Sequence, residues 1–320
     1  TTSPYTLTKG QFLLYERFEH VPFRTFKKFK RSGFSATAQE PEQRTSQVEM
    51  FNFNNFMLGY GITNALTAYA IVPYAEKTAN GMFQQANGSL TKERYTVSGF
   101  GDTEFMLQYG FKRGARDGIE GWYAYNKDDQ GSIRKHNVKE TKFTVYGSIS
   151  MPNGSIHRGD PSGEPADSGL QAGWGAPSLN LGGAVAQPFL DHWTMLAETS
   201  YRTFSEAGTM GKTGNEFRVN SALGYQLLEN SGGFLSRIDV FQEINYLHLR
   251  RDINENRVPD NASGGDIVYF APSLRLTFKK VSIGIIAKFP WLTDLNSRSE
   301  QQGGEGLEKY RIAVTVSLPL

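Results

Sequence analysis

The chain contains no cysteine, and this absence excludes several kinds of chemistry at once. A disulfide framework, a thiolate metal site and covalent haem attachment all require cysteine. A cysteine-free composition occurs in bacterial outer-membrane proteins and in many cytosolic proteins, so it does not decide between those locations.

Long apolar runs are also missing. The most apolar stretch, 281–292, is interrupted by Ser282 and Lys288, whereas a transmembrane helix needs about 18 or more consecutive apolar residues. A protein that crosses a membrane with helices is therefore excluded. Residues 1–10 lack the basic start and apolar core of a signal peptide, so we expect a mature chain if the protein is exported.

Neither sign of charge dominates, since 34 Lys and Arg residues are balanced by 32 Asp and Glu residues. This balance argues against a nucleic-acid-binding protein. The hydrophobic fraction is only 38% and the mean hydropathy is −0.45, yet aromatic residues reach 13% and there are 34 glycines. Such a composition suits a wall that is apolar on its outside and polar on its inside.

Alternation of apolar and polar residues is the main structural signal. At the C-terminus one face carries Tyr310, Ile312, Val314, Val316, Leu318 and Leu320, and the other face carries Arg311, Ala313, Thr315 and Ser317. Two earlier segments, 215–228 and 234–251, alternate in the same way and place several charges on the polar face. Those charges would be costly in a soluble core, but water in a lumen solvates them.

We predict a single domain, 1–320, that folds as an all-β, transmembrane, antiparallel up-and-down β-barrel of about twelve strands. The expected strands are 11–20, 45–62, 65–76, 98–113, 140–152, 170–186, 192–205, 215–228, 234–251, 266–278, 281–290 and 308–320. Several of them reach the ~9–11 residues that a tilted membrane strand needs.

The connections alternate between tight turns and long polar loops. Tight connections fall at 63–64, 187–191, 229–233 and 278–280, and long ones at 21–44, 77–97, 153–169, 252–265 and 291–307. This asymmetry predicts short periplasmic turns, long extracellular loops such as 21–44 and 153–169, and both termini in the periplasm.

Residues 115–139 break this scheme, because they form a long connection on the periplasmic side. Two interpretations are open for this segment, with its core at Trp122–Asn126. It is an ordinary insertion, or it is a hairpin that docks a periplasmic partner protein.

Charged residues at inward positions are the candidates for a lumen or selectivity site. They are Glu49, Glu104, Glu198, Arg202, Glu216, Arg218, Arg237, Asp239, Glu243, Arg275 and Arg311, with Arg17 and Lys288 beside them. We expect Arg202, Arg218 and Arg237 to face Glu198, Glu216, Asp239 and Glu243 in a ladder of ion pairs. The ladder either only fills and stiffens a narrow interior, or forms a constriction that selects solutes by size and charge. Phe51, Phe53 and Phe241 are also candidates for the inner face.

The first long loop combines positive charge with aromatic residues. Arg24, Lys27, Lys28, Lys30 and Arg31 are interleaved with Phe23, Phe26 and Phe29. This pattern predicts contact with lipopolysaccharide phosphates or with an anionic ligand.

No enzyme motif stands out. The five histidines, His20, His136, His157, His192 and His248, are scattered without a companion serine motif. No spacing predicts a metal site, and no helix follows the Gly99-Phe-Gly101 or Gly173-Trp-Gly175 fragments that a nucleotide site would use. We therefore expect no enzymatic activity, cofactor or metal, and hold a lipid-modifying enzyme as a remote third class.

Three strings resemble a bacterial outer-membrane family described as transporters of the meta-cleavage pathway of phenol degradation. They are YGITNALTAYAIVPY at Tyr60–Tyr74, SGFGDTEF at Ser98–Phe105 and GSISMPNG at Gly147–Gly154. The likeness continues through 175–201 and the closing strand, and thus covers most of the chain from about residue 45. The 115–139 insertion and the basic first loop depart from the family pattern. The resemblance implies an outer-membrane barrel linked to the passage of small aromatic or hydrophobic compounds.

We therefore expect an outer-membrane channel that passes small solutes by passive diffusion through a narrow polar lumen, in contact with outer-membrane lipid and lipopolysaccharide. A twelve-stranded barrel is wide enough for only a narrow pore. The alternative, from a different class, is a structural barrel that sheaths or docks a partner such as an electron carrier.

Overall fold

The protein is an antiparallel β-barrel in the computed structural model. The structure describes residues 6–24, 47–84, 89–113, 141–190, 192–207, 211–230, 233–254, 257–260, 263–296 and 308–320. The strands are β1 (Phe12–Pro22), β2 (Gln47–Gly61), β3 (Leu66–Gln84), β4 (Leu90–Phe100), β5 (Glu104–Arg113), β6 (Thr141–Ser150), β7 (Ser178–Leu190), β8 (Trp193–Phe204), β9 (Glu216–Glu229), β10 (Leu235–Leu249), β11 (Gly265–Phe278), β12 (Val281–Leu295) and β13 (Arg311–Pro319). A short 3₁₀ turn, η1 (Ser168–Leu170), precedes β7.

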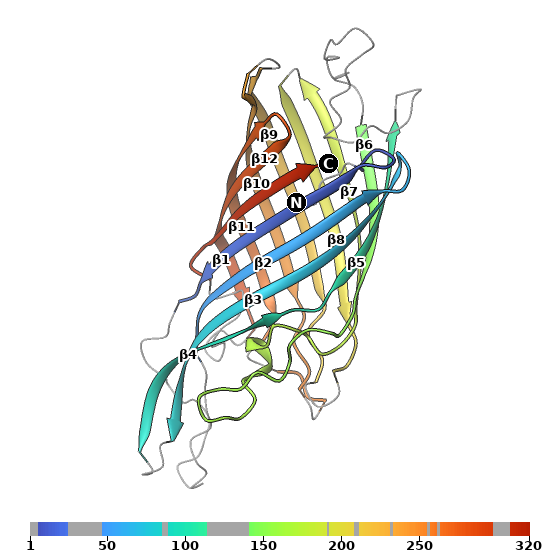
Figure 1. The fold of residues 1–320 in the computed structure, drawn as a ribbon. Coiled ribbons are helices and arrows are strands. Elements are labelled where there is room, and N and C mark those ends of the chain that lie inside the picture. Colours follow the sequence, from blue (N-terminus) through green and yellow to red (C-terminus); the bar gives the residue numbers. More distant parts are fainter. Residues whose placement is uncertain are drawn as a thin grey trace.

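The sheet closes on itself because the first strand pairs with the last. In β1, Tyr15 lies opposite Ser317 of β13, and the other edge of β1 pairs with β2. From β2 the ring continues through β3, β5 and β6 to β13, each strand antiparallel to its neighbour. Figure 1 shows β1 and β13 side by side on the front of the barrel. Each of these ring strands thereby has a hydrogen-bonded neighbour on both sides, as a membrane requires.

β4 and β5 are two halves of one interrupted strand, so the ring has twelve strands. Both halves pair with β3, where Tyr74 lies opposite Phe100 and Ile71 lies opposite Glu104. The break lies at residues 101–103, between the two halves. The predicted twelve-stranded barrel is confirmed.

The prediction was wrong about residues 77–97, which were expected to form a loop. β3 continues to Gln84 and β4 returns from Leu90, so most of this range is a paired hairpin. The hairpin extends beyond the rest of the wall at the lower left of Figure 1. The largest of the other differences are that β7 spans Ser178–Leu190 rather than 170–186 and that β12 continues to Leu295 rather than ending at 290.

The two ends of the barrel differ in their connections. At one end, here called the turn end, short connections at 62–65, 191–192, 230–234 and 279–280 join the strands. At the other, the loop end, the connections between β6 and β7 and between β10 and β11 span 151–177 and 250–264. The predicted alternation of short turns and long loops is confirmed for these connections, and the insertion at 115–139 lies outside the described residues.

The outer face carries a band of exposed apolar side chains, here called the apolar belt. Its members include Leu14, Phe18, Phe56, Leu58, Phe105, Leu107, Val145, Ile149, Leu179, Leu181, Val219, Leu223, Ile244, Phe270, Ile285 and Val316. Successive side chains of a strand point to opposite faces, so their sequence neighbours point into the barrel. An apolar belt around a closed barrel is the surface that lipid covers.

Aromatic side chains border the belt near the turn end. The pairs are Phe12–Tyr60, Phe111–Phe143, Trp193–Tyr225 and Phe234–Phe278, with ring centroids 4.7–5.4 Å apart. Aromatic girdles of this kind mark the interface between membrane and water in transmembrane barrels.

The loops at the loop end pack on one another. The Gly214 amide donates to Asp252 Oδ1 at 2.6 Å, and Lys212 pairs with Ile253 in an isolated bridge. Burial raises the pKa of the Asp252 carboxyl above its ordinary value, and the hydrogen bond from Gly214 offsets part of this shift. Within the described part of the chain, no helix is long and apolar enough to span a membrane.

A charge placed on the apolar belt should destabilise the barrel in lipid. Leu107→Arg, at a side chain 55% exposed, should lower the free energy of unfolding by about 2–4 kcal/mol because the guanidinium displaces lipid contacts. Val258→Arg is the matched control, since Val258 is 54% exposed but lies in the 250–264 loop, and it should change stability by less than about 0.5 kcal/mol. Reversible urea unfolding in lipid vesicles measures both, and equal effects would contradict a lipid-covered belt.

Candidate functional site: the barrel lumen

A cavity of about 1100 Å³ occupies the lumen and is lined by side chains from the twelve strands of the ring. At the loop end its lining includes residues of the 151–177 and 250–264 connections, and at the turn end it includes Thr6 and Leu7. The cavity therefore extends between segments that cover the two ends of the barrel.

Charged side chains line the middle of this cavity. We call them the charged belt: Arg17, Glu19, Glu104, Arg202, Glu216, Arg218 and Arg311. On β1 and β13, Glu19 lies between two arginines: Arg17 Nε is 2.5 Å from its Oε1, and Arg311 Nη1 is 3.0 Å from its Oε2. Arg311 also pairs with the fully buried carboxylate of Glu308. These ionic contacts hold three long side chains in fixed positions on the inner wall.

On the opposite side of the lumen, Arg202 of β8 reaches Glu104 of β5. Its Nη2 donates to both carboxylate oxygens, at 2.8 and 3.1 Å. Two strands, β6 and β7, separate these residues in the ring. Their inward side chains at this level are small, Ser148 and Asn180, so the arginine can pass over them. Ser148 also donates to Glu104.

Part of the predicted ladder is present, since Arg202 and Glu216 lie opposite each other in the β8–β9 register. Two pairs lie within one strand, Arg218–Glu216 at 2.8 Å and Arg237–Asp239 at 2.7 Å, because residues i and i+2 share a face. Glu198 accepts hydrogen bonds from the Tyr146 hydroxyl at 2.8 Å and the Asn220 amide at 3.0 Å.

The structure sorts the remaining candidates by position. Those that line the cavity are Arg17, Glu104, Glu198, Arg202, Glu216, Arg218, Glu243, Arg275, Lys288 and Arg311. Arg237 and Asp239 pair with each other outside the cavity lining. Glu49 does not line the cavity either: it pairs with Arg94 on the β3–β4 hairpin at 2.6 Å, with both side chains exposed.

Aromatic side chains line the loop end of the cavity. The rings of Phe23 and Phe51 are 4.7 Å apart, and those of Phe51 and Phe53 are 5.8 Å apart. Phe51 and Phe53 thus lie on the inner face, as does Phe241 nearer the turn end. Aromatic side chains thus contribute to the lining on both sides of the charged belt, together with polar ones such as Lys77 and Gln108.

The 151–177 connection folds into the loop end of the lumen. Lys77 of β3 donates to the carbonyl oxygens of Gly169 and Gln171, at 3.0 and 2.7 Å. Gln171 in turn donates to the carbonyls of Arg158 and Ala166. Sequence reasoning missed this element, although Lys77 at an inward position between Ala75 and Ala79 was a signal that an acceptor lies inside.

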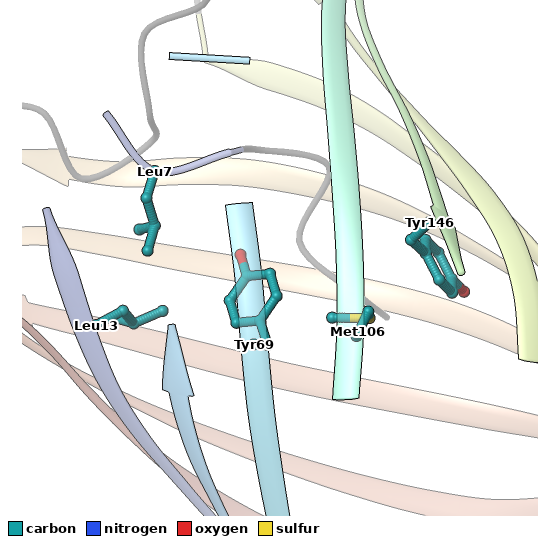
Figure 2. Close-up of a cluster of buried hydrophobic side chains, with 5 residues drawn as sticks. All are labelled: Leu7, Leu13, Tyr69, Met106 and Tyr146. Carbon is teal, nitrogen blue, oxygen red and sulfur yellow. The ribbon is translucent and has the colours of Figure 1, made fainter. Parts of the chain in front are cut away.

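Residues 6–8 of the N-terminal segment pack at the turn end of the lumen. Leu7 packs against Leu13, Tyr69, Met106 and Tyr146, which come from β1, β3, β5 and β6 (Figure 2). Its amide donates to Thr67 Oγ1 at 2.8 Å. A Cβ atom at Gly61 would lie 2.0 Å from the Thr8 carbonyl oxygen, so only glycine permits this approach. The sequence pattern of residues 1–10 carried no signal for this inward fold.

Most of the residues that were predicted to bind lipopolysaccharide or a partner protein lie outside the described part of the chain. Arg24 is exposed at the loop end, and Lys27, Lys28, Lys30 and Arg31 lie outside the described residues, as does 115–139. Within the part that the structure describes, no three His, Asp or Glu side chains are arranged to hold a metal ion.

The closed twelve-stranded sheet, its apolar belt and its charged lumen define a bacterial outer-membrane β-barrel. A family described as "Putative MetA-pathway of phenol degradation" matches residues 28–282, and the chain belongs to this family. No curated protein matches the chain.

Solved structures support the same fold. The crystal structure of an outer membrane channel from Pseudomonas putida F1 aligns over 100% of this chain and 99% of that chain, with a TM-score of 0.64 at 10% identity. The β domain of the Bordetella autotransporter BrkA aligns over 98% and 100% of the two chains at 9% identity, with a TM-score of 0.46 that is too low to support an argument.

The Arg202–Glu104 contact should contribute measurably to stability. Its side chains are 24% and 14% exposed, so a double-mutant cycle of Arg202→Met and Glu104→Gln should give a coupling energy of about 1–3 kcal/mol. The exposed Arg94–Glu49 pair, with side chains 60% and 37% exposed, should give less than about 1 kcal/mol. Urea unfolding of both cycles in vesicles measures the energies, and a coupling near zero for Arg202–Glu104 would contradict a fixed contact over β6 and β7.

Proposed function

We propose that the chain is an outer-membrane channel through which small solutes diffuse passively. The carrying observation is the cavity that extends between the ends of the barrel and is lined by all twelve strands of the ring. Diffusion down a gradient needs no energy source, and the wall supplies only the path. The family's description mentions phenol degradation, and the similar Pseudomonas putida structure is described as a channel.

The order of the lining side chains along the barrel axis, from the loop end to the turn end, supports selection among solutes. Phe23, Phe51 and Phe53 lie together at the loop end beside Lys77, the charged belt follows, and the Leu7 cluster lies at the turn end. A solute must therefore desolvate against apolar walls and also pass charged groups. Small molecules with both an apolar body and a polar group fit this sequence of environments.

The size of the cavity supports a small solute over a protein guest. Ligand pockets for small molecules measure about 300–1,000 Å³, and the lumen is of similar volume at about 1100 Å³. The lumen therefore has no room to sheath a folded partner. Docking of a partner on 115–139, and binding of lipopolysaccharide by the first loop, stay predictions because those segments lie outside the described residues.

Passage requires the N-terminal segment to leave the lumen. Thr6 lies against β5, where a Cβ atom at Gly110 would be 2.9 Å from Thr6 Cγ2. A disulfide joins Cβ atoms about 3.5–4.5 Å apart, so Thr6→Cys/Gly110→Cys should form one, in a chain that has no other cysteine.

The experiment is single-channel recording in planar bilayers, with liposome uptake of small aromatic compounds as a second measurement. The unmodified chain should conduct, and the double-cysteine variant should conduct when reduced and close when oxidised. Thr6→Cys alone is the control and should not respond to oxidant. If the unmodified chain shows neither conductance nor uptake, the proposed function is wrong.

A further inference from the structure

Four cationic side chains gather on one side of the lumen. Arg275, Lys288, Arg311 and Arg17 come from β11, β12, β13 and β1, which are consecutive in the ring, and all four line the cavity. We call these four residues the basic wall. The Arg202–Glu104 contact lies on the other side of the lumen, on β8 and β5.

Two members of the basic wall oppose each other directly. Lys288 and Arg311 are cross-strand partners in the β12–β13 register, and like charges in such positions destabilise a sheet. Arg311 is compensated by Glu19 and Glu308. Lys288, in contrast, forms no hydrogen bond or ion pair with any other residue that the structure describes, although its ammonium group offers three donors.

None of the described carboxylates around the basic wall forms an ion pair with Lys288. Glu19 is shared by Arg17 and Arg311, and Glu308 binds Arg311. Glu243 influences Lys288 electrostatically but forms no ion pair with it, and its oxygens lie 3.4 Å from Ser273 Oγ and Asn245 Nδ2. Asp239 lies opposite Arg275 in the β10–β11 register and pairs with Arg237, which leaves Lys288 without a direct carboxylate partner among the described residues.

Aromatic rings lie beside the same cations. The Arg275 guanidinium is 5.2 Å from the centre of the Phe241 ring, and Lys288 Nζ is 6.0 Å from the centre of the Tyr269 ring. Phe241 and Ile286 both line the cavity here. A flat apolar body could pack on these side chains while its charged group meets the basic wall.

We propose that the basic wall binds a small aromatic monocarboxylate, whose carboxylate accepts hydrogen bonds from Lys288 Nζ. The inference deepens the proposed function, because it names the chemical class of solute that the lumen retains. A neutral phenol of the same size lacks the charge that Lys288 requires, and acetate lacks the body that packs against Phe241 and Ile286.

The test is calorimetric titration of the purified protein in detergent with benzoate, phenol and acetate. Benzoate should bind, and phenol and acetate should each bind at least tenfold more weakly. This comparison uses the unmodified chain, so it does not depend on the folding of any variant. Phenol or acetate binding as tightly as benzoate would overturn the assignment.

Variants then locate the site. Lys288→Met should weaken benzoate binding about tenfold or more, since a hydrogen-bonded charge pair is lost, and Lys288→Arg should retain binding. Lys280→Met, in the tight turn before β12, removes the same charge outside the lumen and should leave binding unchanged. Equal losses in Lys288→Met and Lys280→Met would place the anion elsewhere and overturn the inference.

Bilayer recording separates the two proposals. Benzoate binding by a protein that neither conducts nor transports would contradict the channel and leave the site intact. Conductance without benzoate binding would contradict the site and leave the channel intact. If both proposals hold, benzoate should block the current through the unmodified chain. About tenfold more benzoate should be needed to block the current through the Lys288→Met variant.

Discussion

Closure of the sheet through β1 and β13 is the constraint on which the rest of the structure depends. A membrane offers no water to satisfy backbone polar groups, so every strand in the wall must have two neighbours. Once the ring is closed, alternation assigns each residue to lipid or to the lumen. The apolar belt and the charged belt are therefore two consequences of one geometry, and neither can change register without exposing charge to lipid.

The narrow lumen brings inward side chains from different strands into contact. Charged side chains from strands that are not neighbours meet, as Arg202 and Glu104 do, because β6 and β7 carry small inward residues between them. Elsewhere the arginines pair within their own strands or share Glu19. Most of the lumen arginines thereby contact a carboxylate, whereas Lys288 forms no hydrogen bond or ion pair with any other described residue. Segments at both ends, held by Lys77 and around Leu7, limit access to this region.

Alternation made much of the fold predictable from sequence. In β9 it separated Phe217 and Val219 from Glu216 and Arg218. Phe217 and Val219 do lie exposed on the outer face, and Glu216 and Arg218 do line the cavity. The partners of the lumen charges were not predictable, because a contact across the lumen depends on the width of the barrel and on side chains of intervening strands. The inward folds of Leu7 and of the 168–171 segment carry no periodicity, so nothing in the pattern distinguished them from external segments.

The central claim is that neighbouring residues of one strand face lipid and water in turn, and cysteine accessibility tests it most directly. The chain has no cysteine, so each introduced thiol is unique. Ser200 and Asn220 line the cavity, whereas Thr199 and Val219 are exposed on the outer face and lie opposite each other in the β8–β9 register. In proteoliposomes, Ser200→Cys and Asn220→Cys should react with a small hydrophilic thiol reagent, and Thr199→Cys and Val219→Cys should react only with a lipid-soluble one. Equal reactivity of neighbouring positions would contradict the account.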